Sequence, residues 1–194
     1  MLESVENQEV WGRYTFLGYD PKLEITCMNG EMCIRESGSE EGAKEPVAHP
    51  GAKIKEILKE YTSPKVKDLP SFTGGLVGYF SYDYVKYSEP KLNLDADDQE
   101  GFKDVDLMLF DKVIAFDNLR QKIYIIANAR TEDLEQEYDR CLAEIEEIVD
   151  LIEHGTPAQI TPGKITSEFR PLFSEQEYCA MVEKAKHYIY EGDI

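Results

Sequence analysis

Residues 71–83 read Ser71-Phe72-Thr73-Gly74-Gly75-Leu76-Val77-Gly78-Tyr79-Phe80-Ser81-Tyr82-Asp83, a β-prone aromatic run that contains three glycines and ends on an acid. Glycine inside a strand pattern marks a bulge, or a place where another backbone or a ligand approaches closely. The pattern alone leaves these alternatives open, and by chemistry alone the run is only a candidate pocket wall. For Asp83 we prefer pairing with Lys86, or capping of a neighbouring amide, to a role as a general base.

Two hairpins are predicted around this run. Residues 10–17 form a probable strand, and residues 23–28 pair with 31–35 through an Asn-Gly turn, the strongest short hairpin signal. That register places Cys27 opposite Met32 and Cys33 opposite Thr26, so the two thiols point to opposite faces of the sheet. We interpret all four cysteines as reduced packing residues. The second hairpin joins the apolar runs 107–116 and 122–127, and the polar segment 36–50 is predicted to be a surface loop.

Three helices are indicated by apolar periodicity. One covers residues 54–61, a long one covers 134–152 with an acidic outer face, and the last begins at a Ser174–Glu177 capping box and ends at Gly192. Residues 156–164 between the last two helices are rich in proline and glycine, as a linker is. We therefore place a domain boundary there, with one domain over 1–163 and a second segment over 164–194.

The charge of the chain excludes one class of partner. The 194 residues carry a formal net charge of −18, which repels nucleic-acid phosphates. No apolar run approaches the roughly 20 residues of a membrane span, and Glu3 and Glu6 stand where a signal peptide would carry bases, so we expect a cytoplasmic protein. The acidic stretch 89–106 does not fit a calcium loop, because Glu100 replaces the required glycine. We expect no metal site in this chain.

Three stretches together resemble anthranilate synthase component I. Residues 71–83 resemble the segment that opens the central sheet of that family's N-terminal domain. Leu2-Glu3-Ser4-Val5-Glu6, followed by Gly12-Arg13-Tyr14-Thr15-Phe16-Leu17-Gly18, resembles its first strand pair, and Glu191-Gly192-Asp193-Ile194 resembles the opening of its chorismate-binding domain. The resemblance implies an α+β fold with a largely antiparallel sheet and helices packed on it. It also implies that 1–163 is the N-terminal regulatory domain, and that 164–194 is a linker with the first helix of a truncated chorismate-binding domain.

The candidate site lies in the first strand pair. Glu3, Ser4, Arg13 and Tyr14 offer a carboxylate, a hydroxyl, a guanidinium and an aromatic face, which suit a zwitterionic amino acid with an apolar side chain. From chemistry alone, a polar sheet edge with an internal Glu-Arg pair is the simpler interpretation. The resemblance implies instead the feedback site for L-tryptophan, with Ser4 as its leading residue and Glu3, Leu2, Arg13 and Tyr14 as neighbours. It names no catalytic residue and no metal ligand in this chain.

For the intact enzyme, the resemblance implies conversion of chorismate and ammonia to anthranilate and pyruvate, a lyase reaction of tryptophan biosynthesis. It further implies Mg²⁺ as the cofactor, a glutamine amidotransferase subunit (anthranilate synthase component II) as the partner that supplies ammonia, and no activity for this fragment alone. Two alternatives stay open. One is aminodeoxychorismate synthase component I of the folate pathway, and the other is a stand-alone amino-acid-binding module.

Overall fold

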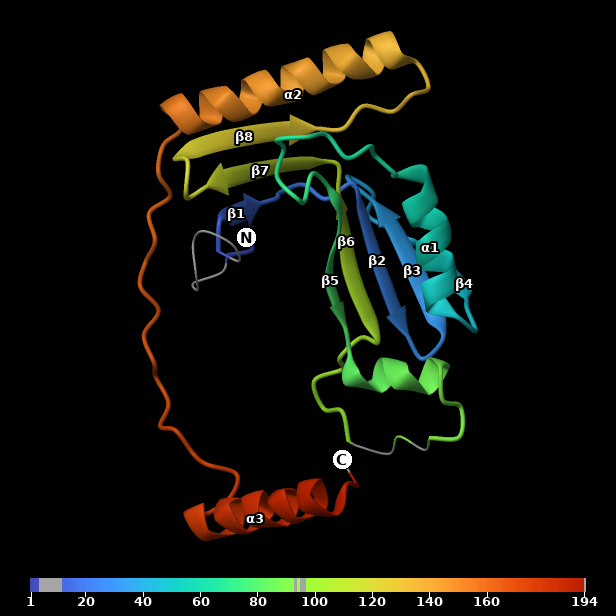
Figure 1. Cartoon of the computed structure of the whole chain (residues 1–194), viewed down its shortest axis with the longest axis vertical. Coiled ribbons are helices and arrows are strands. Elements are labelled where there is room, and N and C mark those ends of the chain that lie inside the picture. Colours follow the sequence, from blue (N-terminus) through green and yellow to red (C-terminus); the bar gives the residue numbers. More distant parts are fainter. Residues whose placement is uncertain (4–11, 93, 95–96, 194) are drawn as a thin grey trace. The chain divides into compact units, whose positions relative to one another are not determined.

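The computed structural model describes residues 1–3, 12–92, 94 and 97–193, and the chain divides into two compact units, Met1–Gly155 and Thr156–Ile194. The first unit carries the sheets and the helices α1 and α2, and α3 lies in the second (Figure 1). The strands are β1 (Tyr14–Leu17), β2 (Leu23–Met28), β3 (Glu31–Glu36), β4 (Ala43–Pro46), β5 (Gly75–Phe80), β6 (Val105–Phe110), β7 (Lys112–Asp117) and β8 (Lys122–Ala127). The helices are α1 (Pro50–Glu60), α2 (Leu134–His154), α3 (Glu175–Glu191) and a short 3₁₀ helix, Tyr82–Tyr87.

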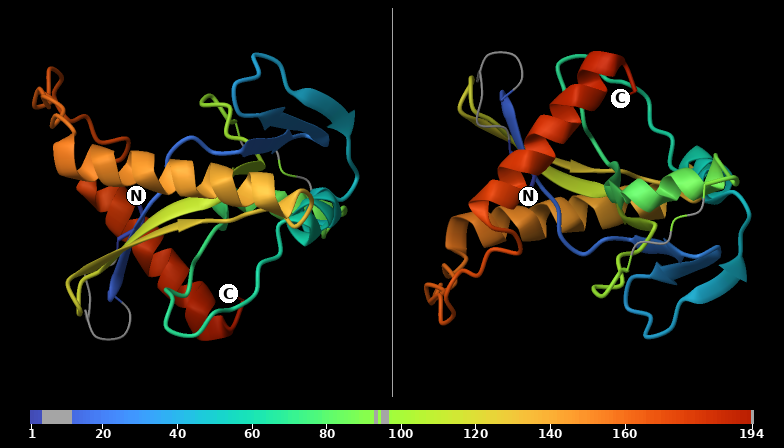
Figure 2. Two further views of the ribbon diagram at one scale, coloured as in Figure 1. Left: turned by 90° about the horizontal axis from the view of Figure 1, so that it is seen from above. Right: turned by 90° about the horizontal axis from the view of Figure 1, so that it is seen from below.

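Within the described residues, the strands form two antiparallel sheets. One has five strands in the order β4-β3-β2-β6-β5, and the other has three in the order β1-β7-β8. α1 contributes Ile54 to the core of the five-stranded sheet, while α2 runs beside β8 of the smaller sheet (Figures 1 and 2). The expected α+β fold, antiparallel sheet with helices packed on it, is confirmed. None of the described helices is long and apolar enough to cross a membrane.

The chain passes from one sheet to the other at Asp111. β6 ends at Phe110 and β7 begins at Lys112, so the single strand predicted over 107–116 is in fact two strands in different sheets. The two polar residues Asp111 and Lys112 are the only interruption in this apolar run, and they do not by themselves indicate a change of sheet. The corner is held by polar contacts that come from distant parts of the chain. Lys22 Nζ lies 3.1 Å from the Asp111 carboxylate, and the backbone N–H of Asn128 donates to the Asp111 carbonyl at 2.9 Å.

The predicted β2–β3 hairpin is confirmed residue by residue. Cys27 pairs with Met32, and Thr26 pairs with Cys33. Asn29 and Gly30 have φ values of 50° and 80°, the positive pair that a type I′ turn requires. Cys27 and Met32 are buried on the core face of the sheet. They pack there with the other buried residues of this core, Leu23, Ile25, Ile54, Val105, Leu107 and Leu109.

The glycine-rich run forms β5, and its crowded neighbour is β6. Gly78 pairs with Leu107 at φ 156°, and a Cβ atom at Gly78 would overlap the backbone oxygen of Asp106. Of the alternatives that the glycine pattern allows, the structure therefore shows the close approach of another backbone. At Gly74, a Cβ would lie 2.9 Å from the carbonyl oxygen of Phe110. Glycine is therefore required where β5 meets β6.

The segment 36–50 is not entirely a loop, because it contains β4, which pairs with β3. Strand pairing needs backbone groups rather than apolar side chains, so a polar edge strand gives little sequence signal. Ion pairs support this edge, with Lys44 3.1 Å from Glu31 and Lys53 3.0 Å from Glu45. α1 then begins at Pro50, earlier than the apolar stripe suggested. Proline suits the first helical turn, where its missing N–H would be unbonded anyway.

Lys86 does not pair with Asp83. Its Nζ lies 2.6 Å from the Asp104 carboxylate and donates to Asn29 Oδ1 at 2.9 Å. Asp104 is buried, and it also accepts the Tyr87 hydroxyl at 2.7 Å and the Asn29 backbone N–H at 2.7 Å. A buried carboxylate gains more from a nearby cation than a more exposed one does. The expected Asp83–Lys86 pair is therefore wrong, and Lys86 helps to hold the β2–β3 turn instead.

α3 begins at the predicted capping box. The Ser174 hydroxyl accepts the backbone N–H of Glu177 at 3.3 Å, and the Glu177 carboxylate accepts the backbone N–H of Ser174 at 2.8 Å. Gly192 ends the helix at φ 81°. The first compact unit ends at Gly155, before the stretch in which the sequence places the boundary. The assignment of 1–163 to a regulatory domain and of 164–194 to the opening of a catalytic domain stays a prediction.

Candidate functional site

The residues predicted to bind an amino acid gather at β1. Leu2 forms a two-way backbone bridge with Phe16, with N–H to O distances of 2.8 and 2.9 Å. Tyr14 opens the same strand and Arg13 immediately precedes it, so the structure brings Leu2, Glu3, Arg13 and Tyr14 to one place, which we call the β1 edge. Ser4, the leading candidate, lies outside the described residues.

Arg13 is anchored at the β1 edge by Asp117 at the end of β7. Its Nη2 donates to Asp117 Oδ2 at 2.7 Å, and its Nε donates to Asp117 Oδ1 at 3.1 Å. The Asp117 side chain is fully buried, and it also accepts the backbone N–H groups of Leu119 and Arg120. These donors, Arg13 first among them, lower the pKa of Asp117 to about 2 despite its burial. The internal ion pair of Arg13 is thus formed with Asp117 and not with Glu3.

The contact with Asp117 holds the Arg13 guanidinium in one orientation. The guanidinium lies over the Tyr14 ring, 4.8 Å from the ring centre, and a quarter of the Arg13 side chain stays exposed. The Asp117 carboxylate accepts hydrogen bonds from Nε and Nη2 of Arg13. Among the described residues, no side chain bonds to Nη1 of Arg13. A guanidinium held in this way can bind a carboxylate, and the neighbouring aromatic ring can cover an apolar group. Sequence reasoning missed Asp117, for which the only signal is an Asp-Asn pair opening a turn.

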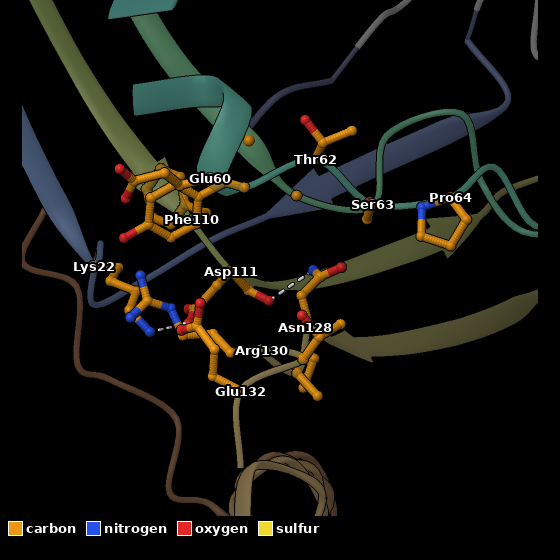
Figure 3. Close-up of a pocket in the computed structure, with 16 residues that line it drawn as sticks. Lys22, Glu60, Thr62, Ser63, Pro64, Phe110, Asp111, Asn128, Arg130 and Glu132 are labelled. Atoms are coloured by element: carbon orange, nitrogen blue, oxygen red, sulfur yellow. Dashed lines mark hydrogen bonds and ion pairs between the residues drawn. The ribbon is translucent and has the colours of Figure 1, made fainter. Parts of the chain in front are cut away.

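A second site lies at the corner where the chain changes sheets (Figure 3). It is a cavity of about 690 Å³, which we call the corner cavity. Its floor is cross-linked by Asn128, whose side-chain amide donates to the carbonyls of Asp111 and Thr73, both at 2.8 Å. Sequence reasoning missed this cavity because its walls come from distant segments. The lining residues are Lys22, residues 60–64, Gly74, Gly75, Phe110, Asp111 and residues 127–132.

The remaining candidates are the acid-rich stretch and the histidines. The acid-rich stretch 89–106 includes Asp95, which lies outside the described residues. Among the residues that are described, no three histidine, cysteine, aspartate or glutamate side chains gather in a way that could hold a metal ion. His154 Nδ1 lies 3.0 Å from the Asp150 carboxylate on its own helix. The β1 edge and the corner cavity are thus the two candidate places for ligand binding considered among the described residues.

Comparison with known proteins places the chain in a family. Anthranilate synthase component 1 of Aquifex aeolicus is 36% identical, that of Acinetobacter calcoaceticus 34% and that of Acetivibrio thermocellus 33%, each over all of this chain. The chain spans about two fifths of the length of these relatives. The resemblance to anthranilate synthase component I is thereby confirmed.

A solved structure supports the same fold. The crystal structure of anthranilate synthase component I from Streptococcus pneumoniae matches with a TM-score of 0.54 and 22% identity, over all of this chain and 40% of that one. A family model described as chorismate binding enzyme matches residues 4–194, nearly the whole chain. The chain therefore belongs to the chorismate binding enzyme family.

Proposed function

We propose that this chain is the tryptophan-sensing, N-terminal part of an anthranilate synthase component I. The observation that carries the proposal is the match over the whole chain to relatives of that name, at 33–36% identity. The geometry of the β1 edge is consistent with a sensing role. In this proposal, Arg13 binds the carboxylate of L-tryptophan, Tyr14 and Leu2 cover the indole, and Glu3 and Ser4 bind the ammonium group.

In the complete protein we propose that chorismate and ammonia are converted to anthranilate and pyruvate, the lyase step that commits chorismate to tryptophan. A glutamine amidotransferase subunit, component II, would supply the ammonia, and the assembly would work in the cytoplasm. Mg²⁺ would neutralise the substrate carboxylate. The described residues do not fit a Mg²⁺ site, because no three metal-ligating side chains gather among them. In this proposal, the magnesium ligands and the catalytic residues lie in the part of the relatives' length that this chain does not span.

The β1 edge supplies one wall of the proposed tryptophan site, which limits its affinity. A small ligand needs most of its surface buried before binding offsets the loss of its freedom. Leu2 is 50% exposed. We expect this chain alone to bind L-tryptophan no more tightly than about 1 mM, equivalent to about −4 kcal/mol. The full-length protein should bind it orders of magnitude more tightly.

Turnover by this chain and by the full-length protein tests the proposed function. With chorismate, Mg²⁺ and an ammonium salt, this chain should give no fluorescent anthranilate, because the groups that stabilise the transition state lie elsewhere. The full-length protein should form anthranilate under the same conditions. Anthranilate formed by this chain and retained through repurification would contradict the proposal. Release of aminodeoxychorismate by the full-length protein would instead support the folate-pathway alternative.

A further inference from the structure

The corner cavity has the size and position of a small-molecule site. Its volume of about 690 Å³ lies within the range usual for ligand pockets. Gly74 and Phe110 belong to the side of the five-stranded sheet, Ala127 ends the three-stranded sheet, and Thr62 follows α1. Figure 3 shows Lys22, Asp111 and Arg130 close together on one wall, with Thr62, Ser63 and Pro64 along another.

The basic wall of the cavity holds a guanidinium that is positioned for an anion. Arg130 lies over the Tyr61 ring, 5.6 Å from its centre, a contact that restrains the side chain without neutralising it. Within the described part of the chain, its guanidinium has no ion-pair partner. Lys22 Nζ, 3.1 Å from the Asp111 carboxylate, adds a second cation to the same wall.

Two carboxylates complete the charge pattern. Glu60 and Glu132 also line the cavity, and neither forms an ion pair with another described residue. The cavity thus presents uncompensated charge of both signs. A bare anion would satisfy Arg130 and be repelled by the acids, and a bare cation would meet the opposite mismatch. A molecule that carries a negative and a positive group can pair with Arg130 through the first and with the two carboxylates through the second.

We propose that the corner cavity binds a small zwitterion, an α-amino acid with an apolar side chain, at a site separate from the β1 edge. Arg130 and Lys22 bind the carboxylate, Glu60 and Glu132 bind the ammonium group, and Phe110 and Pro64 contact the side chain. The walls come from both sheets, so a bound ligand contacts both at the corner where the chain crosses between them. This site does not depend on the proposed anthranilate synthase activity.

An NMR titration of the ¹⁵N-labelled chain tests the ligand class. The probes are L-phenylalanine, 3-phenylpropanoate, which lacks the ammonium group, and 2-phenylethylamine, which lacks the carboxylate. L-phenylalanine should shift the amide signals of residues 62–63 and 129–132 saturably, with a dissociation constant of about 1 mM. Each single-charge probe should bind about tenfold more weakly or worse. The absence of saturable shifts, equal binding of 3-phenylpropanoate, or shifts confined to residues 13–16 would overturn the proposal.

Matched variants test the two charged walls separately. Arg130→Gln and Glu132→Gln should each weaken L-phenylalanine binding about tenfold, because each removes one charge-assisted contact. Arg170→Gln, an exposed arginine in the second unit, should leave the affinity unchanged. All three positions are exposed, so we expect each variant to keep the fold. Unchanged amide signals from residues away from the cavity check this. Unchanged binding by Arg130→Gln would contradict the assignment.

Discussion

Replacing Asp117 with alanine is expected to lower the free energy of unfolding by about 3 kcal/mol. The carboxylate is fully buried and accepts hydrogen bonds from Arg13, Leu119 and Arg120. Its removal leaves the guanidinium and two backbone N–H groups without their acceptor, and an unsatisfied buried donor costs about 1–3 kcal/mol. Urea unfolding followed by circular dichroism measures the change.

A surface ion pair provides the control for this prediction. Glu24→Ala removes the partner of Arg35, and both side chains of that pair are more than a third exposed. Exposed pairs contribute about 0–1 kcal/mol, so this variant should unfold close to the wild type. Equal losses in the two variants would show that the Asp117 contacts do not hold β1 on β7.

The same carboxylate predicts how stability depends on pH. In the folded chain the pKa of Asp117 is about 2, against an ordinary value of 3.8, because Arg13 stabilises the ionised form. Stability from this group is therefore present above about pH 4 and is lost as the pH falls toward about 2. Arg140 lowers the pKa of Glu137 to about 2 in the same way, so both groups contribute to acid unfolding. In Asp117→Asn the loss over this interval should be smaller than in the wild type.

Gly78→Ala is expected to cost about 3–5 kcal/mol, the other large effect. Two penalties add at this position. The φ of 156° is rarely adopted by residues with a side chain, and the new methyl group would overlap the backbone oxygen of Asp106. The backbone of β6 is fixed by pairing on both sides, with β5 and with β2, so it cannot easily move away. Thermal unfolding of the variant measures the loss.

Gly38→Ala separates the two penalties. Gly38 has a φ of 79°, but no atom lies within 4 Å of the place that a Cβ would occupy. This control therefore carries only the backbone penalty and should cost about 1 kcal/mol. If both glycine variants lose the same stability, the close approach of β5 to β6 does not explain why the run needs glycine.

The elements that could be predicted from the sequence are those determined by a few neighbouring residues, such as a turn or a helix cap. The Asn29-Gly30 turn set the whole register of the β2–β3 hairpin, because only a few residue pairs tolerate its backbone angles. The Ser174–Glu177 capping box fixed the start of α3 for the same kind of reason. Gly78 indicated either a bulge or the close approach of a backbone or a ligand, and the sequence did not decide between them.

Features that join distant residues could not be predicted from one sequence. Arg13 and Asp117 are separated by 104 positions, and nothing local to either residue points to the other. The corner at Asp111 shows in the sequence only as one short break in an apolar run. Lys22 and Asn128, which hold the corner by hydrogen bonds to Asp111, lie far away in the sequence. Lys86 pairs with the buried Asp104 and not with Asp83, which is nearer in the sequence. The burial of Asp104, which the sequence does not show, decides this pairing.

The central claim, that this chain carries a tryptophan sensor, is tested most directly by feedback inhibition of the full-length protein. The quantity to measure is the L-tryptophan concentration that halves anthranilate formation, in the wild type and in Ser4→Phe. We predict that Ser4→Phe raises this concentration by about tenfold or more while chorismate turnover is kept, because the added ring blocks the effector and not the reaction. Ser39→Phe, at an exposed serine, serves as the control and should leave inhibition unchanged. Equal inhibition of wild type and Ser4→Phe would contradict the account and place the effector site elsewhere.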